Sequence, residues 1–294
     1  MQKFLNIIFF ASLSVNLFAQ TNYKGFIDKY PIELVTNIYS DGDARAIYTY
    51  QKYDDPIIIN GKVSKDTLNL YEKDVHGNIT ATLSFPHFNK KSNTQTGTWK
   101  EQKTSKQLTI TINKDFEVED GDSIETVNRE IIQPYSLPGY YFKLVISKSK
   151  DNFYPRVSGV KIMQKKTDSL MQSIKIDCQL SGLDNIETGD YNFDGLTDFS
   201  VFESSHAGPN TSRIYFLFDP KTKKFFDPKF EGVSLEFDSD RKRIFEHNQC
   251  CAGRLHTTAV YKVVNNKMVL IEQHCYIWDE KKQDLVERKW KDCQ

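Results

Sequence analysis

The sequence predicts an all-β protein built mainly from antiparallel strands and divided into two β-rich domains. Aromatic residues make up 13% of the 294 residues, against only 14 glycines and 9 prolines, a balance that favours strands and tight turns over flexible linkers. Short runs of alternating apolar and polar residues recur between turn-forming residues. All five cysteines fall in the second half of the chain, which indicates two separately built halves. We expect a meander or small barrel followed by a β-sandwich-like domain.

The N-terminus has the features of a signal peptide. Lys3 supplies a positive charge, and an apolar run from Phe4 to Phe18 ends at the small residue Ala19. This run is too short to cross a bilayer comfortably, and it has too few polar residues for a buried amphipathic helix. We therefore predict a signal peptide over residues 1–19 and export to the periplasm or the cell exterior. No later run is apolar enough for a membrane helix.

The overall charge excludes one broad class of partner. Lysine plus arginine and aspartate plus glutamate both total 39, so the formal net charge is +0. Because nucleic-acid-binding proteins usually carry a basic excess, we expect no nucleic-acid partner.

The first half reads as a lead-in over residues 20–30 and an antiparallel β-domain over residues 31–113. Apolar residues alternate with polar ones at Leu68 and Leu70, from Ile79 to Phe85, and from Leu108 to Ile112. Turn-forming residues separate these runs. They lie at 41–43, 54–56, 60–61, 76–78 and 89–93.

Residues 114–138 read as an acidic linker. Six of the eleven residues from Asp115 to Glu125 are acidic, which leaves no apolar face to bury. A short helix is expected over residues 123–132, limited by Pro134 and Pro138.

Strands are expected to resume in the C-terminal β-domain, residues 139–294. Tyr140–Ser147 reads as a strand, and a hairpin is expected around the turn at residues 165–169. A second hairpin is expected around Asn265 and Asn266, since asparagine tolerates the left-handed dihedrals of a two-residue turn.

One loop in this half has the spacing of a calcium site. Residues 190–198 read D-x-N-x-D-G-x-x-D. Ca²⁺ prefers six to eight oxygen ligands, and side chains at loop positions one, three and five converge when a glycine at position six allows a sharp turn. Position twelve is Val201 rather than the glutamate of an EF-hand, so a strand-flanked loop is predicted. The predicted ligands are Asp190, Asn192, Asp194, the carbonyl of Leu196, and Asp198.

An ion-free turn rich in aspartate and asparagine is the alternative interpretation of this loop. It leaves three carboxylates crowded within nine residues that contain no lysine or arginine. A bound Ca²⁺ would act as a structural brace, because extracellular modules bind it weakly and the sequence offers no acid or base beside it for catalysis.

The cysteines suit an oxidising compartment and are disulfide candidates. Cys250 or Cys251 is expected to pair with Cys275 or Cys178, and one cysteine must stay unpaired or bridge to another chain. The adjacent pair lacks the C-x-x-C spacing that favours zinc. The five candidates are Cys178, Cys250, Cys251, Cys275 and Cys293.

The second half also resembles a known family. The loop 190–198, the segments 208–211 and 216–225, and Cys250–Gly253 are similar to the Ca²⁺-binding periplasmic immunity proteins of bacterial killing systems, over about residues 140–278. The resemblance implies a β-fold related to the invertebrate-type lysozyme inhibitors and a partner that cuts peptidoglycan. The Ser-Gly-x-x-Tyr inhibitory loop of those inhibitors is not matched, because Ile162 and Asn185 stand at the tyrosine position after the two Ser-Gly pairs.

A partner-binding loop is sought instead in the polar segment after the predicted calcium loop. Its candidate residues are Ser204, Ser205, His206 and Asn210, and an ordinary surface connection is the alternative. We found no nucleophile elbow, zinc-protease helix, phosphate loop or dinucleotide fingerprint. We expect an exported, calcium-binding, non-enzymatic protein that binds a macromolecule, and the resemblance implies an inhibitor or immunity protein against a cell-wall hydrolase. A Ca²⁺-dependent cell-surface or glycan-binding module and an unrecognised hydrolase are the alternatives.

Overall fold

The computed structural model describes residues 19–52, 55–121 and 123–293. Apart from Ala19, the predicted signal peptide lies outside these residues. The first eight strands form a closed antiparallel barrel, in which β8 pairs with β1. They are β1 (Ala19–Ile27), β2 (Tyr30–Ile38), β3 (Asp43–Tyr50), β4 (Ile57–Ser64), β5 (Thr67–Lys73), β6 (Ile79–Phe85), β7 (Thr94–Glu101) and β8 (Gln107–Glu119). The predicted all-β antiparallel class is therefore confirmed.

The barrel includes two segments that the sequence assigned differently. Residues 20–27, expected as a lead-in, lie in β1, where Tyr23 and Ile27 are buried in the barrel core. Asn60 and Gly61, expected as a turn, lie inside β4. A Cβ atom at Gly61 would lie only 1.7 Å from the carbonyl oxygen of Asn69 on β5, so the glycine permits close approach of two strands rather than a turn.

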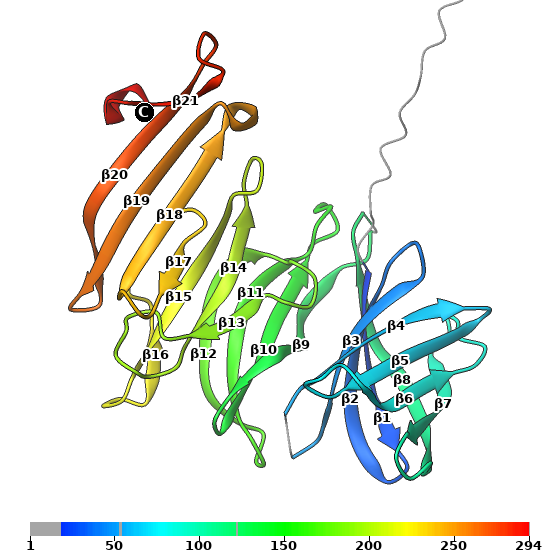
Figure 1. Cartoon of the computed structure of the whole chain (residues 1–294). Coiled ribbons are helices and arrows are strands. Elements are labelled where there is room, and N and C mark those ends of the chain that lie inside the picture. The colour runs from blue at the N-terminus through cyan, green and yellow to red at the C-terminus, as the bar shows by residue number, and fades with distance from the viewer. Residues whose placement is uncertain (1–18, 53–54, 122, 294) are drawn as a thin grey trace, which may run out of the picture.

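Three further antiparallel sheets follow the barrel. Figure 1 shows them in a row, with the barrel at one end and the last sheet at the other. The first contains β9 (Thr126–Leu137), β10 (Tyr140–Lys148), β11 (Arg156–Gln164) and β12 (Ser169–Gln179); the second contains β13 (Ile186–Gly189), β14 (Asp198–Ser205), β15 (Thr211–Asp219) and β16 (Lys224–Phe226). The third contains β17 (Glu236–Asp238), β18 (Arg243–Cys250), β19 (Leu255–Val264), β20 (Lys267–Asp279) and β21 (Asp284–Arg288).

The predicted helix over residues 123–132 is wrong. Thr126–Leu137 forms β9, which pairs with β10, and the acidic segment before it continues β8 as far as Glu119. An irregularity in the β9–β10 register accommodates Pro134, which lacks a backbone N–H. Burial of Ile131 and Ile132 stabilises a strand where local composition favoured a helix. The described residues contain no α-helix; the two helical elements are short 3₁₀ turns, η1 (Cys251–Gly253) and η2 (Trp290–Asp292).

The first two sheets share one hydrophobic core. Phe199 on β14 lies 4.9 Å from Phe142 on β10, measured between ring centroids, and both side chains are completely buried. Both predicted hairpins are confirmed. The β11–β12 turn spans residues 165–168, and Asn265 and Asn266 between β19 and β20 adopt left-handed φ values of 50° and 57°.

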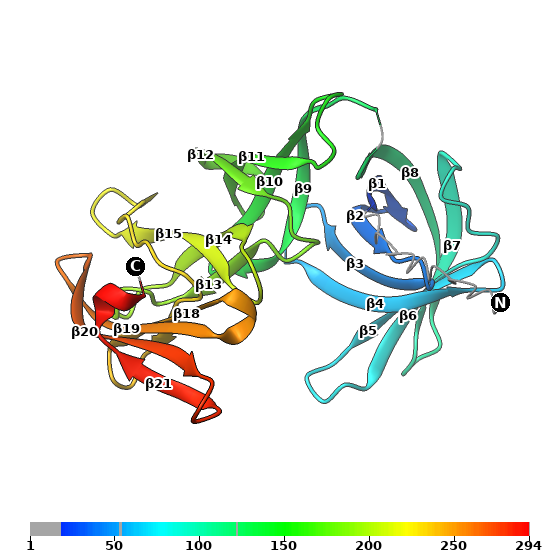
Figure 2. The same ribbon diagram turned by 90° about the horizontal axis from the view of Figure 1, so that it is seen from above.

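The barrel contacts this core through one outer side. The side chains of Val35 and Ile47 belong to the core of the two sheets and not to the core of the barrel. Beside them, the guanidinium of Arg45 donates two hydrogen bonds to the carboxylate of Asp184 in the loop before β13. Figure 2 shows the barrel next to β9 and β10 from a second direction. Among the described residues, no helix has the length and apolarity needed to span a membrane.

Candidate functional site

The acidic loop at residues 190–198 connects β13 to β14 and is therefore flanked by strands. Phe193 and Gly195 adopt left-handed φ values of 63° and 85°, which reverse the chain between Asp190 and Asp198. The glycine at position six of the motif serves the sharp turn for which it was singled out.

Three of the predicted ligands come together in this loop. The carboxylate of Asp190 accepts hydrogen bonds from the N–H groups of Asp194 (3.0 Å) and Gly195 (2.8 Å). Asp194 accepts one from the N–H of Leu196 and one from the side-chain amide of Asn192, both at 2.8 Å. These contacts are those of a self-contained turn rich in aspartate and asparagine.

Asp198 is arranged differently. Its carboxylate is fully buried and accepts hydrogen bonds from the N–H of Tyr191 at 2.9 Å and from the N–H of Phe218 at 2.8 Å. Burial raises the pKa of Asp198 to about 6; the two N–H donors oppose this shift, and the nearby Asp194 and Asp190 carboxylates add to it. Asp198 therefore joins the loop to β15 from the inside.

The oxygen atoms of the loop can be compared with the needs of a calcium ion. Across the described ranges, no three histidine, cysteine, aspartate or glutamate side chains are grouped so that they could hold a metal ion. A carboxylate has about four lone-pair positions, so Asp190 and Asp194 can accept the loop hydrogen bonds and still ligate a cation. Asp190 is half-buried and Asp194 exposed, whereas Asp198 is buried. The donor types fit Ca²⁺ at positions one, three and five, and reaching the ion from position nine would require movement of Asp198.

The acidic loop also lies at the joint between the second and third sheets. The side-chain amide of Asn192 donates to Asn266 in the β19–β20 turn at 3.0 Å, and the Lys242 ammonium donates to the carbonyl of Phe193 at 3.4 Å. The rings of Tyr191 and Phe193 pack against Phe237 of β17. The loop is therefore in direct contact with the third sheet.

The candidate partner loop, residues 204–211, covers the end of β14 with Ser204 and Ser205, the connection at residues 206–210, and the first residue of β15. Ser204, His206 and Ser212 form a small cluster, with the His206 Nε2 atom 3.3 Å from the Ser204 hydroxyl and 3.1 Å from that of Ser212. The imidazole thus contacts two hydroxyl groups. Ser205 and His206 are exposed.

Asn210 differs from the exposed members of the partner loop because it is buried. Its side chain donates to the carbonyl of Gln249 at 2.7 Å and accepts from the N–H of Gln249 at 3.2 Å. It therefore attaches the loop to β18.

The cysteine pairing differs from the prediction. Cys275 forms a disulfide with Cys293, which joins β20 to the turn η2. Cys178 is a buried free thiol on β12. Cys250 and Cys251 are free, so neither is bonded to Cys275 or Cys178. The strand registers set Cys250 opposite Leu255, Cys275 opposite Thr257 and Cys178 opposite Val157.

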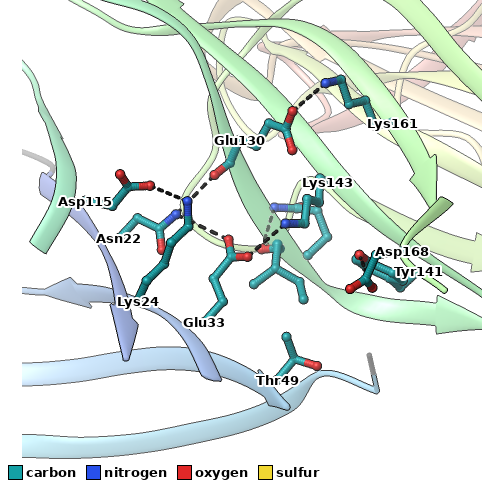
Figure 3. Close-up of polar contacts among 12 residues, drawn as sticks. Asn22, Lys24, Glu33, Thr49, Asp115, Glu130, Tyr141, Lys143, Lys161 and Asp168 are labelled. Carbon is teal, nitrogen blue, oxygen red and sulfur yellow. Dashed lines mark hydrogen bonds and ion pairs between the residues drawn. The ribbon is translucent and has the colours of Figure 1, made fainter. Parts of the chain in front are cut away.

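A cleft between the barrel and the first sheet was not predicted from the sequence. It has a volume of about 480 Å³, and its lining includes charged residues from both sides. Figure 3 shows Lys24 and Glu33 on the barrel facing Lys143 on β10. The Lys143 ammonium lies 2.8 Å from the Glu33 carboxylate, and Lys24 lies 2.8 Å from Asp115. On the far wall, Tyr141 donates a hydrogen bond to Asp168 at 3.0 Å.

In this cleft Lys143 forms an ion pair with Glu33 that favours its protonated form. Burial lowers its pKa, but the attraction and hydrogen bond of Glu33 outweigh burial, so the pKa of Lys143 is raised above its usual value. The ion pair of Lys143 with Glu33 therefore forms a polar contact between the barrel and the first sheet. The only sequence signal was a single charge within each of two apolar runs, Glu33 in 31–35 and Lys143 in 141–145.

Fold and site together define an all-β protein with a closed barrel, three antiparallel sheets and an acidic loop at a joint between sheets. No protein-family model and no curated protein matches the chain. A solved structure of a Xanthomonas type IV secretion system related protein is 14% identical with a TM-score of 0.36, covering 56% of this chain and 98% of that one. The β-propeller domain of the Trilobed protease from Pyrococcus furiosus is 11% identical with a TM-score of 0.25, covering 92% of this chain and 84% of that one. Both scores are too low to define a function.

Proposed function

We propose that this chain is an exported, non-enzymatic protein that binds another macromolecule and is braced by Ca²⁺ at the loop 190–198. The observation that supports the proposal is the position of this loop at the joint of the second and third sheets, where Asn192 contacts Asn266 and Lys242 contacts Phe193. A cation held by Asp190, Asn192 and Asp194 would stiffen this joint and fix the surfaces that the two sheets present. The composition of the loop, with oxygen donors only, suits a hard cation.

Calcium binding should be lost when Asp194 is replaced by alanine. The change removes one carboxylate from the three side chains that converge in the loop, and the measurement is titration calorimetry of Ca²⁺ into the purified protein. For a dissociation constant of about 10⁻⁴ to 10⁻³ M, roughly millimolar Ca²⁺ should stabilise the wild type by about 0.4–1.4 kcal/mol and leave the variant unchanged.

Asp219→Ala is the matched control for this experiment. Asp219 also accepts turn hydrogen bonds, from the N–H of Lys221 and the hydroxyl of Thr222, but it is the last residue of β15, at the start of the β15–β16 turn. The control should lose turn stability and keep the Ca²⁺ isotherm of the wild type. If the Asp194→Ala isotherm is identical to that of the wild type, this loop does not bind calcium.

The partner class proposed is a peptidoglycan-cutting hydrolase, which the sequence resemblance favours. The test incubates the protein with lysozyme-type hydrolases and purified cell-wall sacculi, with and without a calcium chelator. We expect a one-to-one complex that stops the loss of sacculus turbidity and weakens on chelation. Full hydrolase activity at saturating protein, with no complex, would overturn this partner class.

The same experiment separates the alternative functions. A glycan-binding module would sediment with sacculi and leave the hydrolase active. This alternative is favoured by Tyr276 and Trp278, which are half-exposed and alternate along β20 on the same side of the last sheet. An unrecognised hydrolase would release soluble wall fragments without any added enzyme.

The partner loop is tested by a substitution at its exposed tip. Ala207→Arg adds a long charged side chain beside His206 without removing a hydrogen bond that the fold needs, so complex formation should weaken at least tenfold. Asn93→Arg, at an exposed position before β7 on the barrel, is the matched control and should bind like the wild type. Equal affinities for all three proteins would place the interface elsewhere.

A further inference from the structure

Two adjacent cysteines at the connection from β18 to β19 are within reach of each other. The Sγ atoms of Cys250 and Cys251 are 2.8 Å apart. Non-bonded heavy atoms pack best at about 3.5–4.0 Å, and a disulfide bond is about 2.05 Å long. The two sulfur atoms therefore lie between bonding distance and ordinary packing distance.

We propose that Cys250 and Cys251 form a reversible disulfide with each other, which makes this turn a redox-sensitive modification site. The inference depends neither on calcium nor on a partner. It requires only an oxidant of the disulfide class, such as an oxidised thiol-exchange protein or a small-molecule disulfide.

The accessibility of the five cysteines supports this assignment. Cys251 is exposed and Cys250 is half-buried, so an oxidant can reach the pair. Cys275 is already bonded to Cys293. Cys178 is buried, and burial, with smaller contributions from Glu203 and Asp177, raises the pKa of its thiol to about 12, which makes it unreactive. With this assignment four of the five cysteines form two disulfides, and Cys178 remains a buried free thiol.

The backbone of the turn is already bent around the pair. Cys250 is extended, whereas Cys251 and Ala252 have φ values of 57° and 54°. Residues other than glycine seldom adopt this left-handed region, and such residues gather where the surroundings impose a particular shape. Here the shape turns both thiols to the same side.

The reaction balances as an exchange with the oxidant RSSR. The Cys251 thiol loses a proton and its sulfur attacks RSSR, which releases one RS⁻ and leaves a mixed disulfide on Cys251. The Cys250 thiol then loses its proton and attacks the Cys251 sulfur, which releases the second RS⁻. Two electrons pass from the pair to RSSR, and the two protons yield two RSH.

The resulting bond should be easy to reduce. Adjacent Cα atoms are held about 3.8 Å apart by the peptide bond, whereas most disulfides span about 4.4–6.8 Å. The Cα atoms of Cys275 and Cys293 are 5.9 Å apart, within the usual range. A short exposed bridge is therefore expected to open before the one between Cys275 and Cys293.

The position of the turn gives the bond a consequence. The side chain of Asn210 in the partner loop is hydrogen-bonded to both the N–H and the carbonyl of Gln249, the residue before Cys250. Closing or opening the ring at residues 250–251 therefore alters the strand end to which the partner loop is attached.

The test uses the purified full-length chain, glutathione disulfide as the oxidant and alkylation followed by trypsin and mass spectrometry. Cleavage after Arg243 and Arg254 places both cysteines in one peptide, residues 244–254. After oxidation this peptide should carry no alkyl group and be lighter by two hydrogen atoms. After mild reduction it should carry two alkyl groups while Cys275 and Cys293 remain bonded.

Two variants make the outcome decisive. In Cys251→Ser, Cys250 should end as an alkylated thiol or a mixed disulfide with glutathione, and in Cys178→Ser the 244–254 peptide should behave as in the wild type. Two alkyl groups on the wild-type peptide after oxidation would overturn the proposal. A crosslink from this peptide to Cys178 or to a second chain would overturn it equally.

Discussion

Asp198→Ala is expected to destabilise the protein by about 2–6 kcal/mol. The Asp198 carboxylate is fully buried and receives the N–H groups of Tyr191 and Phe218. Alanine leaves both donors unpaired inside the protein, at about 1–3 kcal/mol each. Urea unfolding followed by far-UV circular dichroism measures the change, in buffer with chelator so that calcium does not contribute.

Asp198→Asn is the matched control for this prediction. Asparagine has the same shape and keeps one acceptor oxygen, so its cost should be about half that of alanine. A loss below about 1 kcal/mol for Asp198→Ala would show that these two hydrogen bonds do not hold the loop against β15.

The same residue should give the protein a pH-dependent stability. The pKa of Asp198 in the folded chain, raised mainly by burial to about 6, exceeds its ordinary value of 3.8, so the folded state binds the proton more tightly than the unfolded state. The contribution of this group to stability is therefore fully present below about pH 4 and is lost as the pH rises to about 6. The total change is about 3 kcal/mol, from roughly two pKa units at 1.36 kcal/mol each. The Asp198→Asn variant should lack this component of the pH profile.

Phe199→Ala is expected to cost about 3–5 kcal/mol, the range for removal of a buried aromatic side chain. The ring of Phe199 lies 4.9 Å from each of the rings of Phe142, Phe216 and Phe225, and it is fully buried. Because Phe142 belongs to the first sheet and Phe216 to the second, the cavity would open in the core that the two sheets share. The midpoint of urea unfolding should fall by the same amount whether unfolding is followed in the first sheet or in the second.

Phe218→Ala is the control, since Phe218 is only half-buried and contacts this core from its margin. Its loss should be clearly smaller. Equal losses for the two variants, or a shift confined to the second sheet, would contradict a shared core.

Only part of the candidate site could be predicted from the sequence. The acidic loop was found because its ligand-type residues lie within nine positions, and the Asn265–Asn266 turn because asparagine accepts left-handed dihedrals. The different role of Asp198 was not visible, because the N–H of Phe218 that it binds lies twenty residues further along the chain.

Local pattern by itself determined the all-β class, the hairpins and the acidic loop, since alternation and turn chemistry act over a few residues. Only the tertiary structure decided that residues 126–137 form a strand, that Cys275 pairs with Cys293, and that Glu33 meets Lys143 in a cleft. In each of these cases the deciding partner is supplied by another element, and in the cleft it is 110 residues away. The free energy of such contacts depends on burial and register, which become defined only when the sheets pack.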